Sequence, residues 1–302
     1  MVLEQYPSLQ QVRAAFNRAA HTYDSAAILQ REVATRLLER LDLLTLPPQQ
    51  ILDVGAGTGF CSAALTQRYP TATLVALDLA EAMLQQCRRR LGGWQRWRRG
   101  HSVVAADAAR LPFANASFDL IFSSLTLQWC GDLDRLFAEF RRVLRPGGVL
   151  LFTTFGPDTL WELRASWAAV DAAVHVNHFL DMHEVGDAMV RAQLNDPVMD
   201  SERITLTYRE PVQLLRELKA IGAHNINPGR HVGLTGRQRL MALYRAYEQY
   251  RAADGRLPAS YEVLYGHAYV TTQAVANQAA NRRAESTLSL DRLQQLLRER
   301  SS

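Results

Sequence analysis

Short apolar runs alternate with helical patterns over the first half of the chain. Val, Ile, Leu and Phe concentrate in five runs, which predict buried strands at 51–54, 73–77, 102–106, 118–123 and 149–154. Between these runs, apolar residues recur at helical spacing over 60–69, 80–91 and 133–144. Strands that alternate with helices predict βαβ units and a parallel sheet with right-handed crossovers.

Outside this alternating region the pattern is mainly helical. Residues 8–45 predict helix, which Pro47 and Pro48 end. After Phe155 the pattern predicts helix over 157–196, a strand over 203–208, helices over 211–221 and 238–253, and a strand over 261–272. We therefore expect a helical extension or lid at 1–48, one domain at 49–270 with a helical insertion at about 157–196, and a tail at 271–302.

The composition is that of a globular protein, with 48% hydrophobic and 21% charged residues among 302. No window holds 18 uncharged apolar residues, and the first residues lack the pattern of a secretory signal, so we expect no membrane association. The three cysteines, Cys61, Cys87 and Cys130, contain no CxxC pair. This spacing argues against a disulfide framework and against a metal site, and it fits the reducing cytoplasm.

Arginine dominates the basic residues. Lys and Arg number 34 against 30 acidic residues, and Lys219 is the single lysine. A basic cluster over 88–99 contains Trp94 and Trp97, a pattern that also occurs on RNA-binding surfaces. We expect a solvated loop there and no nucleic-acid partner. A partner with phosphate or carboxylate groups stays as an alternative, because arginine binds both in bidentate fashion.

The sharpest local motif is a glycine-rich turn at 53–59, with the sequence DVGAGTG, between a predicted strand and a predicted helix. Gly55 and Gly57 let the backbone bend tightly and let a ligand approach it. The helix that starts near Gly59 points its free N–H groups at the same place. The spacing is not the dinucleotide form G-x-G-x-x-G, and no Walker lysine follows, which disfavours a nucleoside triphosphate.

Two further strands end in carboxylates. Asp78 ends the second strand, where a carboxylate can accept hydrogen bonds from both ribose hydroxyls. Asp107 follows the third strand, where it could accept from an exocyclic amine, and Asp53 could orient the loop or attract a positive group. A ligand with a ribose, an adenine and a sulfonium suits this set better than NAD does. The pattern therefore indicates S-adenosylmethionine.

Five motifs in order resemble the class I methyltransferases. They are the glycine turn, Asp78, Ala106-Asp107-Ala108, the segment 111–129 (LPFANASFDLIFSSLTLQW) and 144–148 (LRPGG). The resemblance implies a Rossmann-like α/β fold whose seven-stranded, mostly parallel sheet has the order 3-2-1-4-5-7-6, with strand 7 antiparallel. It also implies S-adenosylmethionine as cofactor, with the methionyl part at the glycine turn, the ribose at Asp78 and the adenine beside Asp107. The cofactor-binding candidates are Asp53, Gly55, Ala56, Gly57, Gly59, Asp78, Leu79, Asp107, Ala108 and Ser123.

More specific segments resemble the malonyl-acyl carrier protein O-methyltransferases of biotin synthesis. These segments are 15–24, 152–160, 221–225, 234–236 and 261–267. The resemblance implies methylation of the free carboxyl of a malonyl thioester, on acyl carrier protein or on coenzyme A, which then enters fatty-acid elongation towards a pimeloyl ester. A mitochondrial complex I assembly factor that hydroxylates an arginine shares several segments. A hydroxylase of that kind, a quinone or small-lipid methyltransferase, and a non-catalytic binding module therefore stay as alternatives.

The implied reaction needs positioning rather than a general base. A carboxylate with a pKa near ~4 is already ionised at neutral pH, and in-line alignment can lower the barrier substantially. We expect Tyr23 to hold the acceptor carboxylate or the cofactor, and Arg203 or Arg209 to pair with that carboxylate. Gln128 and Trp129 are expected on the acceptor side, with Trp129 near the sulfonium. The alternatives are a core or capping contact for Tyr23, core packing for Trp129 and solvated side chains for the arginines.

Other polar residues carry weaker expectations. His21, His224 and His267 lack metal-ligand spacing, so we expect ordinary hydrogen-bonded histidines, and Cys130 has no histidine partner that would make it a nucleophile. Carrier proteins of the implied kind are acidic. The candidate docking face for such a partner, on a protein expected to be a monomer, consists of Arg237, Arg239, Arg245 and Arg251.

Overall fold

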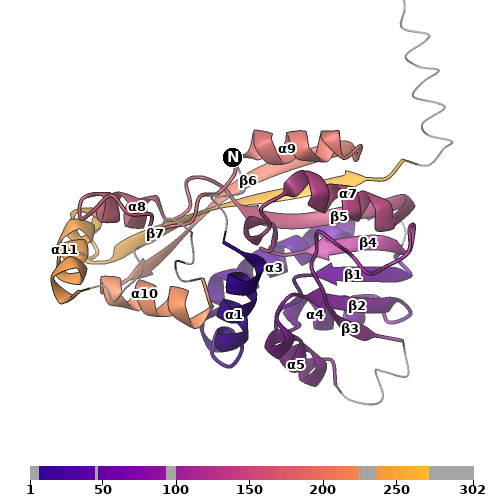
Figure 1. Cartoon of the computed structure of the whole chain (residues 1–302), viewed down its shortest axis with the longest axis horizontal. Coiled ribbons are helices and arrows are strands. Elements are labelled where there is room, and N and C mark those ends of the chain that lie inside the picture. Colours follow the sequence, from indigo (N-terminus) through magenta and orange to yellow (C-terminus); the bar gives the residue numbers. More distant parts are fainter. Residues whose placement is uncertain (1–6, 45–46, 93–99, 224, 226–235, 272–302) are drawn as a thin grey trace, which may run out of the picture.

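The computed structural model describes residues 7–44, 47–92, 100–223, 225 and 236–271. These residues fold around one seven-stranded sheet with helices on both faces (Figure 1). Four of the segments considered in the sequence lie outside the described residues. They are the part of the basic cluster at 93–99, His224, residues 226–235 and the tail from 272.

The sheet has the order β3-β2-β1-β4-β5-β7-β6, as predicted. Its strands are β1 (Gln50–Val54), β2 (Thr73–Asp78), β3 (Ser102–Ala105), β4 (Phe118–Ser123), β5 (Leu144–Phe155), β6 (Asn195–Tyr208) and β7 (Leu257–Tyr269). Strands β1 to β5 pair in parallel, and β7 pairs antiparallel with both β5 and β6. The central strands are continuous apolar runs because helices cover both of their faces.

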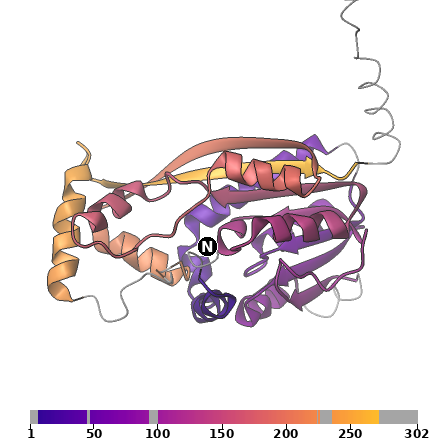
Figure 2. The ribbon, with the colours of Figure 1, turned by 45° about the horizontal axis from the view of Figure 1, so that its top comes forward.

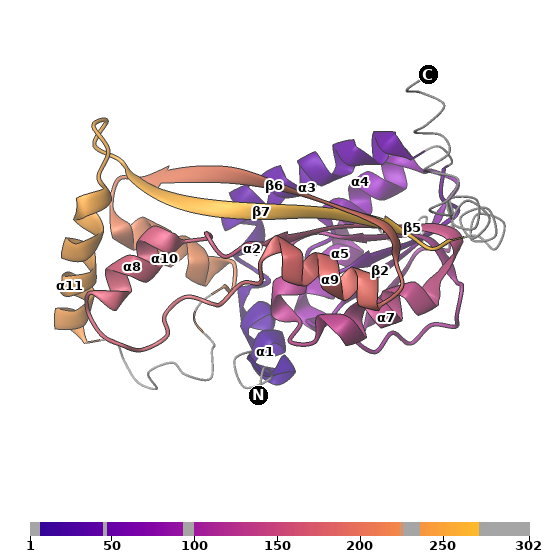
Figure 3. The ribbon, with the colours of Figure 1, turned by 90° about the horizontal axis from the view of Figure 1, so that it is seen from above.

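Alternate side chains of β1 enter two separate apolar cores. Ile51 packs with the helices α3 (Ile28–Glu39), α4 (Phe60–Arg68) and α5 (Glu81–Arg90). Leu52 lies on the opposite face, with α7 (Leu133–Val143) and α9 (Met182–Arg191). Figure 3 shows α3 and α4 on one side of the sheet and α7 and α9 on the other. This two-sided packing holds the carboxyl ends of the parallel strands in place.

The N-terminal segment is helical, as predicted, but it is broken into pieces. These are α1 (Leu9–Ala19), α2 (Tyr23–Ala26), α3 and the short 3-10 helix η2 (Arg40–Leu43). Ser8 begins α1 with a capping box, in which its hydroxyl and the side chain of Gln11 satisfy each other's backbone N–H groups. Helix α1 packs on α5, whereas α3 packs on the sheet side. The breaks therefore let α2 cross the carboxyl edge of the sheet.

The two last strands are longer than the sheet that they join. β5 pairs with β7 only over Val263–Tyr269, and the remaining part of β7, Leu257–Glu262, pairs with β6 alone. The projecting ribbon carries α8 (Trp161–Ala168), α10 (Pro211–Ala220) and α11 (Arg237–Tyr247). We call these three helices and the ribbon the helical lobe. Figures 1 and 2 show the lobe at the end of the molecule away from β1 to β4.

The prediction of continuous helix over 157–196 is wrong for the segment 169–181. Helix α8 ends at Ala168, and the carboxylate of Asp171 then accepts from the backbone N–H of Ala173 at 3.0 Å, a local turn that competes with helix. A capping box at Asp181 starts α9. Because α9 packs between α7 and β6, it covers the sheet and is not part of an inserted unit.

The sequence also placed the start of β6 too late. The strand begins at Asn195 rather than at 203, and its pairing with β7 is irregular between Asn195 and Val198. Pro197 lies within that irregularity, on the edge strand of the sheet, where a residue without an N–H is tolerated. Pro197 is therefore accommodated inside the strand.

Candidate functional site

Two adjoining cavities open at the carboxyl ends of the parallel strands. The glycine-turn cavity, of about 730 Å³, lies against β1, β2, β3 and the loop after β4. The lobe cavity, also about 730 Å³, lies between that loop and the helical lobe. Both cavities are lined by the side chains of Phe16, Tyr23, Leu125 and Trp129. Ligands of open α/β sheets bind at this edge, where the strand order reverses between β1 and β4.

Asp78 ends β2 and lines the glycine-turn cavity, as predicted. Its Oδ2 accepts from the backbone N–H of Gly57 at 2.9 Å, and its Oδ1 accepts from that of Ala80 at 2.7 Å. Each carboxylate oxygen keeps a second lone pair. The carboxylate is thus held in one orientation and can still accept from two hydroxyl groups of a ribose.

The three glycines of the turn are needed for two different reasons. All have positive φ angles, +73° at Gly55, +54° at Gly57 and +86° at Gly59. A Cβ on Gly55 would lie 1.9 Å from Oγ1 of Thr126, and one on Gly59 would lie 2.7 Å from Sγ of Cys87. A Cβ on Gly57 would meet no side chain within 4 Å. Gly57 is therefore the residue whose backbone is open to a ligand, while the other two allow close packing.

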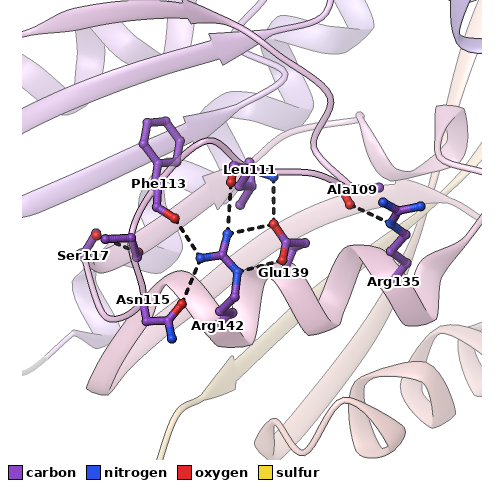
Figure 4. A network of polar contacts seen from close by, with 9 residues as sticks. Ala109, Leu111, Phe113, Asn115, Ser117, Arg135, Glu139 and Arg142 are labelled. Atoms are coloured by element: carbon purple, nitrogen blue, oxygen red, sulfur yellow. Dashed lines mark hydrogen bonds and ion pairs between the residues drawn. The ribbon is translucent and has the colours of Figure 1, made fainter.

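Asp107 and Ala108 also line the glycine-turn cavity, and a network on α7 holds the loop that follows them (Figure 4). The guanidinium of Arg142 donates to the carbonyls of Phe113 at 2.7 Å and Leu111 at 3.0 Å, and it pairs with Glu139. Glu139 in turn accepts from the N–H of Leu111 at 2.8 Å. Arg142 holds the pKa of Glu139 below its usual range. Arg142 and Glu139 thus fix, through its backbone, the segment that resembles a methyltransferase motif.

Four of the predicted cofactor residues lie behind the cavity wall and do not line it. Ser62 donates to the buried carboxylate of Asp53 at 2.5 Å, and Ser123 donates to the carbonyl of Val54 at 2.9 Å. Ala56 and Gly59 likewise form the turn without lining the cavity. Leu79 does line it, together with residues that the sequence did not single out, among them Val12, Met83, Ser124 and Thr126. Thr126 could have been identified only by its contact with Gly55, which the sequence does not show because the two residues are far apart in the chain.

Two acidic side chains lie at this end of the cavity: Asp78 lines it, and Asp53 is buried behind its wall. Burial raises the pKa of the Asp53 carboxyl to about 7, and the nearby charge of Asp78 adds to the shift. Burial also raises the pKa of Asp78. Two carboxylates that are destabilised by burial favour a ligand that brings a positive charge. The cavity therefore fits a sulfonium with an attached ribose.

Tyr23 lies on α2 at the wall between the two cavities, where Phe16 and Trp129 pack edge to face at 5.2 Å. Burial, and next the charge of Asp78, raise the pKa of the Tyr23 hydroxyl well above its usual value. The hydroxyl is thus a hydrogen-bond donor throughout the neutral range. The predicted role of the hydroxyl, to hold the acceptor carboxylate or the cofactor, stays a prediction.

A three-residue contact, which we call the α2 latch, holds this helix over the glycine turn. The hydroxyl of Thr58 donates to Oδ1 of Asp24 at 2.6 Å. The guanidinium of Arg90 donates to Oδ2 of Asp24 at 2.5 Å and to the Thr58 hydroxyl at 3.0 Å. The latch ties α2, the glycine turn and α5 together. Arg90, part of the basic cluster in the sequence, thus binds other residues of the same chain.

Gln128 and Trp129 line the lobe cavity, and their place on the acceptor side stays a prediction. The amide of Gln128 donates to the carbonyl of Leu125 at 2.6 Å, and its oxygen accepts from Thr154 at 3.3 Å. Both ends of the amide are occupied, so Gln128 shapes the cavity wall. Trp129 borders both cavities.

The two arginines predicted to bind the acceptor do not line either cavity. Arg203 is exposed on β6 and pairs with Asp158 at 2.5 Å. Arg209 is exposed beyond the end of β6, where its backbone carbonyl accepts from Arg251. β6 is the outermost strand of the sheet.

The remaining candidates of the sequence fall at different places. His21 is exposed, and His267 is part of β7, where burial lowers its pKa. Cys130 borders the glycine-turn cavity, and burial raises the pKa of its thiol to about 12, which leaves it protonated and a poor nucleophile. On α11, Arg237, Arg239 and Arg245 are exposed.

The described residues contain no group of three or more His, Cys, Asp or Glu side chains that could hold a metal ion. None of the helices in the described part of the chain combines the length and the apolar composition that a bilayer span requires.

The fold and the glycine-turn cavity define a Rossmann-like methyltransferase. The family model of the methyltransferase domain matches residues 52–152. A proposed methyltransferase from Bacillus halodurans C-125 has a TM-score of 0.56 at 15% identity, over 79% of this chain and 100% of that one. Phosphoethanolamine N-methyltransferase 2 of Haemonchus contortus, in complex with S-adenosyl-L-methionine, has a TM-score of 0.52 at 18% identity, over 85% and 57%. At these identities the likeness shows the fold.

Curated relatives show the family. The malonyl-[acyl-carrier protein] O-methyltransferase of Methylovorus sp. is 51% identical over 271 residues, which are 88% of this chain and 90% of that protein. The enzyme of the same name from Laribacter hongkongensis is 52% identical over 268 residues, 87% of this chain and 90% of that protein. The chain belongs to the malonyl-acyl carrier protein O-methyltransferase family, and the resemblance found in the sequence is confirmed.

Proposed function

We propose that the protein transfers a methyl group from S-adenosylmethionine to the free carboxyl of a malonyl thioester on acyl carrier protein. The product methyl ester would enter fatty-acid elongation towards a pimeloyl ester in biotin synthesis. One observation carries the proposal. The two cavities share a wall made of Phe16, Tyr23, Leu125 and Trp129, so a donor in one and an acceptor in the other can meet there.

The glycine-turn cavity would hold the cofactor. Asp78 would accept from the ribose hydroxyls, Asp107 and Ala108 would lie beside the adenine, and Gly57 would give the ligand access to the backbone. When bound, S-adenosylmethionine supplies an activated methyl group to an acceptor oxygen and leaves as a neutral thioether. The carboxylates of Asp53 and Asp78 favour binding of its positive charge.

The lobe cavity would hold the malonyl group. A malonyl carboxylate is already ionised at neutral pH, so the site has to move no proton. The Tyr23 hydroxyl, kept protonated by burial, can donate to the acceptor carboxylate and help to align it with the methyl group. Because the negative charge is lost in the transition state, strong stabilisation of that charge at the reacting oxygen would slow the reaction.

The broader organisation follows from the same assignment. Residues 1–48 would form the lid over the cofactor and 49–270 the catalytic domain. The acidic carrier protein would dock on exposed cations of α11, where Arg237 and Arg245 are free of ion pairs among the described residues. Arg251, by contrast, is paired with Glu248 at 2.6 Å. We place the protein in the cytoplasm, acting as a monomer.

Intact mass spectrometry tests the function directly. Purified protein incubated with S-adenosylmethionine and malonyl-acyl carrier protein should raise the mass of the carrier by that of one methylene group, because the carboxyl OH becomes OCH₃. Treatment with an esterase should reverse the gain, because the carboxyl is the predicted site. Acetyl-acyl carrier protein, which has no free carboxyl, is the matched control.

A result of no mass gain, with cofactor binding intact by calorimetry, would contradict the malonyl acceptor. The same protein would then be assayed with quinone or small-lipid acceptors and with arginine-containing protein acceptors.

A further inference from the structure

The lobe cavity must accommodate a negatively charged acyl group, if the proposed function is correct. Most of its described lining residues have apolar, amide or hydroxyl side chains. Arg203 and Arg209 lie elsewhere, as shown above. Among the described lining residues, His175 is the one side chain that can carry a positive charge near neutral pH. An anion that enters a poorly hydrated cavity needs such a partner, because transfer out of water is costly.

The imidazole of His175 is held by two neighbours. It stacks flat on the indole of Trp167, with 3.7 Å between ring centroids and 6° between planes. Its Nε2 hydrogen-bonds Oδ1 of Asp171 at 2.7 Å. The side chain is 13% exposed, and Nδ1 has no hydrogen-bond partner in the described part of the chain. The ring is therefore fixed, with one nitrogen engaged and the other available.

Asp171 is a carboxylate built to support this ring. Its Oδ1 also accepts from the N–H of Ala173 at 3.0 Å, and Nε of Arg239 lies 4.0 Å from its Oδ2. The hydrogen bond with His175 lowers the pKa of Asp171, so this residue stays ionised. A carboxylate at one ring nitrogen stabilises a positive charge on an imidazole. The other ring nitrogen can then act as a charged donor.

We propose that His175, oriented by Asp171 and Trp167, binds the carboxylate of the acceptor and lets the site distinguish this substrate from its own product. The contact is present with the malonyl anion and is lost with the neutral methyl ester, so the product binds more weakly and leaves. His175 is thus a substrate-binding residue, and Asp171 is a positioning residue that acts through it. This inference rests on the proposed function.

The assignment predicts a particular kinetic pattern. The interaction with the carboxylate exists in the ground state and weakens as the charge is neutralised, so its removal should raise KM more than it lowers kcat. A charged hydrogen bond of this kind corresponds to roughly 10- to 100-fold in affinity.

The test compares His175→Gln, which preserves much of the side-chain volume, with the wild type. The matched control is His178→Ala, an exposed histidine of the same segment that lines neither cavity. KM and kcat are measured with malonyl-acyl carrier protein, and the affinities of carriers loaded with malonyl and with its methyl ester are compared by competition. Calorimetry with S-adenosylmethionine verifies that each variant is folded.

His175→Gln should raise KM about 10- to 100-fold, change kcat less than about threefold, and reduce the preference for malonyl over its methyl ester by a similar factor. Asp171→Asn should shift the same preference in the same direction by a smaller factor, and the control should shift nothing.

An unchanged preference in His175→Gln, with cofactor binding intact, would overturn the assignment of His175, and so would a loss confined to kcat. If the wild type itself forms no methyl ester on any malonyl thioester, the proposed function fails instead. The two failures are therefore distinguishable in one series of assays.

Discussion

At the scale of single residues, Asp78 carries the most specific expectation. Its carboxylate bridges the N–H groups of Gly57 and Ala80, so it both shapes the glycine turn and faces the cavity. An amide in its place would turn an NH₂ group towards one of these donors. Asparagine, the nearest isostere, therefore cannot make both of these hydrogen bonds in the place of Asp78.

Asp78→Asn should lower the affinity for S-adenosylmethionine by about 100-fold, because a charge-assisted acceptor is removed from a buried site. Calorimetry measures this directly. Asp134→Asn, which changes an exposed carboxylate paired with Arg191, is the matched control and should bind as the wild type does. An unchanged dissociation constant for Asp78→Asn would show that the cofactor lies elsewhere.

The residues that could be predicted from the sequence are those placed by strand ends. Asp78 and Asp107 follow apolar runs directly, so the carboxyl edge of a parallel sheet had to bring them together. Thr126 and His175 could not be found in this way. Thr126 acts through a long-range contact with Gly55, and the Asp171–His175 pair lies in a segment whose composition predicted helix. Their charge made Arg203 and Arg209 candidates for binding the acceptor carboxylate. No local pattern in the sequence reveals that β6 is the outermost strand.

At the scale of elements, α2 is too short to be stable by itself. A helix of four residues gains little from its own hydrogen bonds, so its position depends on tertiary contacts. The α2 latch of Asp24, Thr58 and Arg90 supplies these contacts, and the same helix carries Tyr23. The order of this wall of the site is therefore coupled to a surface-accessible ion pair.

Arg90→Gln should release α2 and speed the dissociation of S-adenosylmethionine about tenfold, with a small effect on the unfolding midpoint, because partly exposed ion pairs contribute about 0–1 kcal/mol to stability. Stopped-flow displacement measures the rate. Arg68→Gln removes a comparable exposed contact, with Asp42, at a residue that lines neither cavity, and serves as the control. Equal dissociation rates in Arg90→Gln and wild type would mean that α2 is held by its apolar contacts alone.

At the scale of the whole molecule, the sheet and its order were predictable because a βαβ alternation admits few topologies. The helical lobe was not. Its helices come from three separated parts of the chain, and only the length of the β6–β7 ribbon beyond β5 brings them together. Strand length past a neighbour is set by pairing partners far away in sequence, and apolar periodicity does not encode it.

The lobe also defines where an acidic carrier would dock. The double variant Arg237→Glu and Arg245→Glu should lower kcat/KM for malonyl-acyl carrier protein about tenfold at low salt, and the wild-type rate should fall as salt rises. A small malonyl thioester should react at the same rate with both proteins. Arg191→Glu, on α9, is the control for the change of charge. A wild-type rate that is insensitive to ionic strength would remove the electrostatic part of docking.

The projecting ribbon has a consequence for biosynthesis of the chain. Every described residue that lines the glycine-turn cavity lies between Leu9 and Cys130, whereas the lobe cavity also needs Tyr261 of β7. A ribosome therefore releases all the described residues that line the glycine-turn cavity long before the lobe cavity can close. Since β7 also inserts between β5 and β6, the last strand to emerge completes both the sheet and the lobe cavity. A chain truncated before β7 would lack, at once, the strand that joins β6 to the sheet and part of the wall of the lobe cavity.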